Sequence, residues 1–259
     1  MFRGFELSVK EDFLSIYKAI GESQHEENKR LVDECLDRFR DGSGDLLAAK
    51  MTAEWFPEID AQVFISHAHK DSALALGLAG HLHKEFGLKS FVDSAVWGYS
   101  DDLLRILDDA FCYNETSGTY SYAKRNRSTS HVHMMLSVAL SRMIDRCECI
   151  IFINTPQSIT SRDYIKGDKT DSPWIYSEIA MTRLIKKRSR EDHRGIGSVL
   201  ATESLGTDTR LRVRYDVDLD HLSKLDGETY GKWTILSNGR AGATALDTLY
   251  DLVPPSPIE

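Results

Sequence analysis

Long apolar runs are missing from the sequence, and no stretch approaches the ~20 residues that a helix needs to cross a bilayer. The first residues also lack the charged, apolar and small-residue regions of a secretory signal peptide. Cysteine is scarce, and its spacing does not fit a zinc site or a disulfide framework; the four residues are Cys35, Cys112, Cys147 and Cys149. We therefore expect a soluble, cytoplasmic protein that does not bind membranes.

An excess of positive charge is absent as well. The chain has 32 Lys and Arg residues against 40 Asp and Glu residues, which gives a formal net charge of −8. This is the wrong sign for a protein that wraps nucleic-acid phosphates. The basic residues at 186–188 and 190 close a predicted helix, where they complement the negative end of the helix dipole. We therefore expect no nucleic-acid partner.

The chain does contain enough apolar material for one sizeable core and an accessory region, with 259 residues and 41% hydrophobic content. Its first part is typical of helices, because apolar residues recur there at helical spacing. They are Leu7, Phe13, Leu14, Ile16, Tyr17 and Ile20, followed by Leu31, Cys35, Leu36 and Phe39. Glycines in the stretch 41–44 break this pattern, and Pro57 follows. We predict that residues 1–58 form a helical extension.

From about residue 60 the pattern alternates between strands and helices. Apolar strands are predicted at 61–66, 88–93 and 149–153, with helices at 71–86 and from about residue 100. Residues 149–153 are apolar throughout, as expected of a parallel strand that is covered on both faces. The alternation predicts an α/β domain over residues 59–259, built on a doubly wound parallel sheet.

The rest of this domain has weaker signals. Ser172 and Pro173 are suited to cap and begin another helix. Further strands are predicted near 196–200 and 211–217, and a last helix near 244–252. The stretch 112–130 is rich in Tyr, Ser, Thr and Asn. We interpret it as an inserted loop, because long loops in compact domains are usually functional or mobile.

Ligands of open α/β sheets bind beyond the carboxyl ends of the strands. Those ends bring together residues 66–69, residues 93–99 and residues 154–156. The helix after the third strand begins near the same edge, and Trp174 and Glu178 share one face of it because they are four residues apart. Position alone favours a plain interpretation, in which Glu178 is a surface carboxylate and Trp174 is a core residue.

Four segments resemble a bacterial TIR domain, in the expected order between about residues 60 and 190. Residues 61–71 (Ala-Gln-Val-Phe-Ile-Ser-His-Ala-His-Lys-Asp) resemble the opening strand and its polar turn. Residues 91–99 look like the second strand and its loop, and residues 150–156 like the third strand. Residues 172–179 (Ser-Pro-Trp-Ile-Tyr-Ser-Glu-Ile) look like the tryptophan-to-glutamate helix. The resemblance implies the flavodoxin-like TIR fold.

The resemblance also implies an activity. In TIR domains that act on NAD, the glutamate of that helix is catalytic, and the matching residue is Glu178. The expected reaction cleaves the nicotinamide–ribose bond and gives ADP-ribose, a cyclic ADP-ribose isomer or a related conjugate. Such proteins are similar to the sensors of Thoeris-type antiphage systems, whose nucleotide product activates a separate effector protein. The inserted loop and the helical extension depart from the simplest family pattern.

One carboxylate is sufficient for this chemistry. Nicotinamide is attached as a cationic pyridinium, so it leaves without the general acid of ordinary glycosidases, and an anion stabilises the charge that builds on the ribose. NAD is thus a substrate, and we expect no cofactor. The residues that we expect to bind it supply flat rings, hydroxyls and polar groups at the sheet edge: Ser66, His67, Asp93, Trp97, Tyr99 and Trp174.

Two other interpretations compete with an NAD-cleaving enzyme. His67, His69 and Asp71 mimic part of a hydrolase zinc motif, but position 72 is Ser where that motif needs a histidine, so we expect no metal. The more serious alternative is a non-enzymatic TIR scaffold that acts through TIR–TIR contacts. Self-association is expected in either case, because TIR active sites are often completed by a neighbouring subunit.

Overall fold

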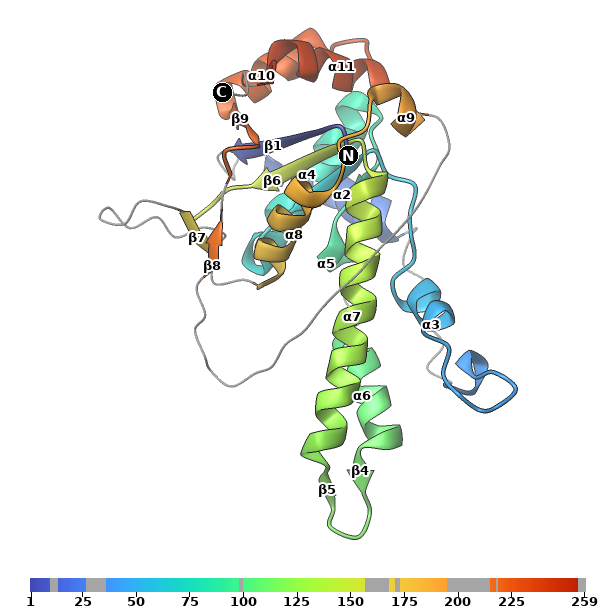
Figure 1. Cartoon of the computed structure of the whole chain (residues 1–259). Coiled ribbons are helices and arrows are strands. Elements are labelled where there is room, and N and C mark those ends of the chain that lie inside the picture. Colours follow the sequence, from blue (N-terminus) through green and yellow to red (C-terminus); the bar gives the residue numbers. More distant parts are fainter. Residues whose placement is uncertain are drawn as a thin grey trace.

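Five parallel strands form the centre of the molecule in a computed structural model of the chain (Figure 1). The structure describes residues 1–9, 14–26, 36–97, 100–156, 168–170, 173–194, 215–217 and 219–255. The strands lie in the order β3-β2-β6-β1-β9, and all neighbours are parallel. Their bounds are Arg3–Ser8 (β1), Val63–Ser66 (β2), Ser90–Phe91 (β3), Cys149–Ile153 (β6) and Ser223–Asp226 (β9). The predicted α/β class with a parallel sheet is confirmed.

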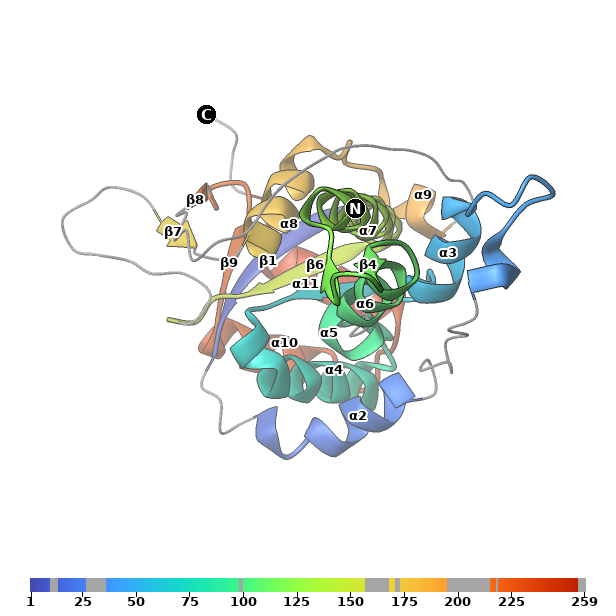
Figure 2. The same ribbon diagram turned by 90° about the horizontal axis from the view of Figure 1, so that it is seen from below.

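Helices cover both faces of the sheet (Figure 2). One face packs against α4 (Ser72–Phe86), α10 (Gly227–Leu236) and α11 (Ala243–Leu252). The other packs against α3 (Ala48–Trp55), α6 (Ser100–Phe111), α7 (Tyr122–Arg146) and α8 (Pro173–Leu184). Because side chains alternate along a strand, consecutive apolar residues enter opposite cores. This explains why β6 is buried along its whole length.

Several predicted elements are present. The strands predicted at 61–66, 88–93 and 149–153 correspond to β2, β3 and β6, and the helices at 71–86 and 244–252 correspond to α4 and α11. Gly87 ends α4 with a φ of 62°, in the left-handed region that favours glycine. The strand predicted near 211–217 is present over residues 215–217, and residues 211–214 lie outside the described residues. It is β8 (Tyr215–Val217), which pairs antiparallel with β7 (Asp168–Thr170) outside the main sheet.

The remaining predictions for this part of the chain concern residues 171–214. The strand predicted near 196–200 and the capping residue Ser172 lie outside the described residues. After α8 the chain forms the short helix α9 (Arg190–Arg194). Its Arg194 donates to Glu148 Oε1 across 3.0 Å, just before β6. This ion pair ties α9 to the start of the sheet.

The prediction of one helical extension over residues 1–58 is wrong at its beginning. β1 lies between β6 and β9 and pairs with both. The reason is that side chains alternate between the two faces of a strand. Phe5 and Leu7 point into one core and are fully buried, while Gly4 and Glu6 face the other way. The later helical prediction holds for α2 (Lys18–Glu26), for the short 3-10 helix η1 (Leu36–Phe39) and for α3.

Glycines join α2 to the main body. A Cβ on Gly21 would lie 2.0 Å from the Leu76 carbonyl oxygen, and one on Gly80 would lie 2.1 Å from that of Tyr17. The two helix backbones are therefore in direct contact, which only residues without a side chain permit. In Figure 2, α2 forms an outer layer over α4. The amino-terminal segment thus belongs to the same folded unit as the sheet.

The stretch predicted as an inserted loop is ordered into a projecting arm, which we define as residues 100–131. The arm consists of α6, the hairpin of β4 (Tyr113–Asn114) and β5 (Thr119–Tyr120), and the first turns of α7. It extends past α5 (Asp93–Val96), away from α10 and α11 (Figure 1). Asp108 holds it together, because its buried carboxylate accepts from Arg125 Nε at 2.8 Å and also from Ser128.

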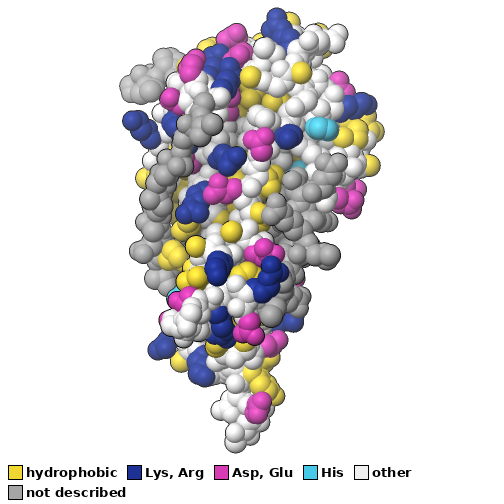
Figure 3. All heavy atoms as spheres, turned by 90° about the vertical axis from the view of Figure 1, so that its right-hand side faces the viewer, with side chains coloured by type: hydrophobic (Ala, Val, Ile, Leu, Met, Phe, Trp, Pro, Cys, Tyr) yellow, Lys and Arg dark blue, Asp and Glu magenta, His cyan; other side chains and the backbone are white. Residues whose placement is uncertain are grey.

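The surface of the arm is mixed in character. Figure 3 shows acidic and basic side chains interspersed there, with hydrophobic side chains toward the tip. The exposed aromatic residues of this tip are Phe111, Tyr113, Tyr120 and Tyr122. α7 is the longest described helix, at 25 residues. Neither α7 nor any other helix within the described ranges combines the length and apolar composition required to cross a membrane.

Candidate active site

α8 directs Glu178 toward the sheet. Four residues of this helix form a buried stripe at helical spacing: Ile175, Glu178, Ile179 and Thr182. Ile175 and Ile179 pack on Phe152 of β6, so the helix is fixed with this stripe against the strand. Glu178 is only 4% exposed. The interpretation of Glu178 as a surface carboxylate therefore does not hold.

The Glu178 carboxyl meets the carboxyl end of β2. The hydroxyl of Ser66, the last residue of that strand, donates a hydrogen bond to Glu178 Oε2. Burial and then the negative charge of Asp93 raise the pKa of Glu178 well above its ordinary value of 4.5. The hydrogen bond from Ser66 opposes that rise, because it stabilises the ionised form. A carboxyl whose charge is disfavoured by its surroundings, at the ligand edge of a sheet, is typical of functional sites.

A cluster of three polar side chains lies beside this pair. His67 follows β2, and Asp93 and Ser94 belong to α5, which follows β3. His67 is 8% exposed, and its Nε2 lies 2.9 Å from Ser94 Oγ in a hydrogen bond. His67 Nδ1 lies 3.6 Å from Asp93 Oδ1. Asp93 begins α5 two residues after the last residue of β3, and its side chain is 32% exposed. The structure thus gathers Ser66, His67, Asp93 and Glu178 at the edge where β2 and β3 end.

No protein-family model, curated protein or solved structure matches the chain. The chemistry of this site therefore has to be inferred from its own residues and their surroundings. Those are a buried carboxyl, the hydroxyl that binds it and a second carboxylate close enough to raise its pKa.

Glu6 and Asn154 also lie toward this edge, and neither was predicted as a site residue. Asn154, which follows β6, donates from Nδ2 to Glu6 Oε1 across 2.6 Å, and Lys224 of β9 forms an ion pair with the other oxygen of Glu6. Glu6 is 5% exposed. The sequence places Asn154 at a strand end, but Glu6 was missed with the rest of β1. Its position between Phe5 and Leu7, two apolar residues at strand spacing, was the available signal.

The predicted aromatic residues do not share one position. Trp97 is 4% exposed, and its ring packs edge-on against Phe56 and Phe91, at 5.8 and 4.7 Å between centroids. Trp97 is thus buried in the core, and it offers no stacking surface at this edge. Trp174 is half-buried one turn before Glu178, with its ring 5.6 Å from that of His133 of α7. Tyr99 lies outside the described residues.

The residues of the zinc-like motif turn to different partners. His67 bonds to Ser94, whereas the Asp71 carboxylate, at the end of the short 3-10 helix η2 (His69–Asp71), accepts from Thr155 Oγ1 at 2.5 Å. His69 is exposed. In the parts of the chain that the structure describes, no three His, Cys, Asp or Glu residues are grouped so that they could hold a metal ion.

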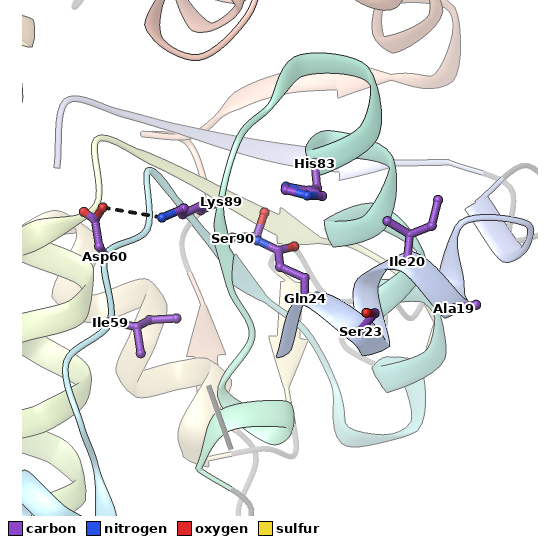
Figure 4. Close-up of a pocket in the computed structure, with 9 residues that line it drawn as sticks. All are labelled: Ala19, Ile20, Ser23, Gln24, Ile59, Asp60, His83, Lys89 and Ser90. Atoms are coloured by element: carbon purple, nitrogen blue, oxygen red, sulfur yellow. Dashed lines mark ion pairs between the residues drawn. The ribbon is translucent and has the colours of Figure 1, made fainter. Parts of the chain in front are cut away.

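A separate cavity of about 450 Å³ lies at the opposite edge of the sheet (Figure 4). It is bordered by α2, by His83 of α4 and by the residues that precede β2 and β3, including Asp60 and Lys89, whose charged atoms lie 4.0 Å apart. The buried Ser90 hydroxyl lines this cavity and has no hydrogen-bond partner among the described residues. The cavity is large enough to admit water to it. It lies at the amino ends of the strands, so it is no part of the Glu178 site.

Proposed function

We propose that this protein cleaves NAD at the nicotinamide–ribose bond and that Glu178 is its catalytic carboxylate. The observation that supports this most is the placement of Glu178: a carboxyl buried against the carboxyl end of a parallel sheet, hydrogen-bonded to Ser66. Open α/β sheets bind ligands at this edge. NAD is the substrate, and the proposed reaction needs neither a cofactor nor a metal.

The reaction breaks the bond between ribose C1′ and the pyridinium nitrogen. The electron pair leaves with nicotinamide, which becomes neutral, and positive charge develops on the ribose. The Glu178 carboxylate stabilises that charge, strongly because it is buried in surroundings of low polarity. Water then adds to C1′ and loses a proton, which gives ADP-ribose. Attack by a group of the same nucleotide gives a cyclic isomer instead.

The raised pKa of Glu178 fits a cationic substrate. Without a ligand, burial and Asp93 favour the protonated carboxyl. A pyridinium placed beside it favours the anion, since an opposite charge lowers the pKa of a carboxyl. Binding of the cation thus forms the charged group that the reaction uses.

The biological setting follows from the same proposal. The sequence resemblance and the parallel α/β sheet together support a TIR-like protein of the cytoplasm, similar to Thoeris-type antiphage sensors. Its partners would be NAD, other copies of itself and a separate effector protein that is reached through the nucleotide product. Nucleic acid and membranes are not among them.

The experiment compares purified wild-type protein, Glu178→Gln and a matched control, Glu115→Gln, on NAD. Glu115 is an exposed glutamate in the hairpin of the arm. We expect Glu178→Gln to lower nicotinamide release by about 10²–10³-fold, as when one group that stabilises transition-state charge is lost. The control should keep wild-type activity. Products are separated and weighed, and equal release by Glu178→Gln and wild type refutes the site.

A scaffold that acts through TIR–TIR assembly is the second candidate. The exposed apolar residues favour it, because Tyr122 is 76% exposed and Leu184 is 84% exposed, and such surfaces often bind other proteins. Ultracentrifugation over a range of concentrations measures the assembly. Self-association without nicotinamide release, in concentrated and crowded samples as well, supports the scaffold against the enzyme.

A further inference from the structure

β1 brings a second buried carboxylate to the candidate active site. Glu6 of β1 and Ser66 of β2 are both paired in register with Phe152 of β6, one on either side of it. Residues in register point to the same face of a sheet, and Phe152 faces α8. Glu6 and Ser66 therefore flank β6 on the face that also holds Glu178.

Asn154 lies two residues beyond Phe152 and is oriented by Glu6. Its Nδ2 donates to Glu6 Oε1 across 2.6 Å, and Lys224 pairs with the other Glu6 oxygen. An ionised carboxylate only accepts hydrogen bonds, so the NH₂ group of Asn154 must face Glu6 and its carbonyl oxygen must face elsewhere. Within the described residues, Asn154 Oδ1 accepts no hydrogen bond. Asn154 is half-buried, and its Oδ1 is therefore an acceptor whose direction is fixed by Glu6 and which has no partner among the described residues.

The position of this acceptor can be derived from sheet geometry. Asn154 is one strand across and two residues further along than Ser66. With about 4.8 Å between strands and about 3.3 Å per residue, their Cα atoms are roughly 8 Å apart. If the ribose lies at Ser66 and Glu178, the neighbouring nicotinamide ring spans a gap of this size. The group at its far side is the carboxamide, whose N–H needs an acceptor.

We propose that Asn154 Oδ1 accepts a hydrogen bond from the carboxamide N–H of nicotinamide and that Glu6 is its positioning residue. This inference rests on the proposed NAD cleavage. A dinucleotide with nicotinic acid in place of nicotinamide presents a carboxylate there. That group has no N–H to donate, and its negative charge is repelled by the partial negative charge of Asn154 Oδ1. The pair would thus select the amide form of the substrate.

The test measures kcat/KM for NAD and for nicotinic acid adenine dinucleotide in each variant. The ratio of the two values is internal to a variant, so a loss of folded protein cancels. Wild type should prefer NAD by about 10–100-fold, as expected when a polar group is left unpaired in a protein site. Asn154→Ala should bring the ratio near unity, mainly by raising KM for NAD.

Variants of Glu6 separate orientation from contact. Glu6→Ala should lower the preference, because the Asn154 amide is free to turn, and Glu6→Gln should restore it, because its carbonyl oxygen accepts the same hydrogen bond. A wild-type ratio in Asn154→Ala overturns this inference, even if both rates fall, since a ribose contact or a purely structural role would lower them equally. If wild type cleaves neither dinucleotide, the proposed function fails and this inference fails with it.

Discussion

Glu178 lies in the buried stripe of α8 that anchors the helix to β6, so its charge has to form in a site that disfavours it. Because the proposed reaction needs the anion, NAD cleavage should depend on pH. We expect kcat/KM to fall as the pH is lowered through the raised pKa of Glu178, well above the ordinary value of 4.5. A rate profile between pH 4 and 9 measures this.

The variant Ser66→Ala tests whether Glu178 determines that pH profile. The Ser66 hydroxyl lowers the pKa of Glu178 by hydrogen-bonding its charged form. Without it the acidic limb of the profile should move to higher pH, while the alkaline plateau persists at a reduced rate. An acidic limb that stays in place in Ser66→Ala would show that another group controls the rate.

Replacing Glu178 by Gln should also stabilise the folded protein, and more so at higher pH. The folded-state pKa of Glu178 is raised, so the folded state holds its proton to a higher pH than the unfolded chain does. The contribution of Glu178 to the free energy of unfolding is therefore fully present below the pKa of the unfolded chain, which is near the ordinary value of 4.5. It is lost as the pH rises through the folded pKa, whereas glutamine stays neutral throughout.

Thermal unfolding at pH 5 and at pH 8.5 measures this difference. The Tm of Glu178→Gln should exceed that of wild type at pH 8.5, by more than at pH 5, and Glu115→Gln should match wild type at both. A gain of stability on loss of activity is typical of functional sites. A Tm of Glu178→Gln below that of wild type at pH 8.5 would argue against a disfavoured buried charge.

Sequence patterns predicted part of this site for a clear physical reason. Ser66 is the end of a strongly apolar strand, and Glu178 follows Trp174 by one helical turn, so short-range periodicity placed both near one edge. It could not assign Trp97, because an aromatic residue near a strand end suits a core as well as a site. The alternation around Glu6 indicates a strand, but the place of Glu6 at this site depends on the pairing of β1 with β6, which local periodicity does not contain.

At the scale of elements, the contact between α2 and α4 depends on glycine. Gly21→Ala should destabilise the protein by about 1–3 kcal/mol, the usual range for overpacking, because its Cβ would lie 2.0 Å from the Leu76 carbonyl oxygen. Gly231→Ala is the control. It lies within α10 with nothing within 4 Å of an added Cβ, so it should gain up to about 1 kcal/mol from helix propensity. Urea unfolding measures both.

If Gly21→Ala unfolds at the wild-type urea concentration, α2 must be able to move off α4 without loss of stability. That result would restore the view of α2 as a detachable extension. Both variants add one Cβ atom to a helix. If one variant lowers the free energy of unfolding and the other raises it, the difference comes from the surroundings of each glycine and not from the substitution itself.

The sequence predicted an element well where a single pattern of apolar residues runs along it. β6 is apolar throughout and α4 is long, with a glycine at its end, and both were predicted close to their observed bounds. β1 has six residues and is followed by apolar residues at helical spacing, so the longer pattern obscured the shorter one. The hairpin of the arm was taken for a loop, because its strands are two residues each.

At the scale of the whole molecule, the first and last strands of the sheet are neighbours. β1 pairs with β9 on one side and with β6 on the other, so the carboxyl-terminal strand reaches the sheet only through the amino-terminal one. Such long-range pairing leaves no local trace in the sequence. A division into two parts near residue 58 would separate β1 from both partners.

A pair of deletions tests this architecture. Removal of residues 1–8 should abolish cooperative unfolding, because Phe5 and Leu7 are fully buried, β6 loses one of its two neighbours and β9 loses the strand that joins it to the sheet. Replacement of residues 113–120 by a short glycine linker should leave the fold and NAD cleavage intact. The linker can close, since Ser121 N already donates to Cys112 O across 2.8 Å. Circular dichroism during urea unfolding measures both variants. A cooperative transition in the variant without residues 1–8 would mean that the sheet is stable without β1.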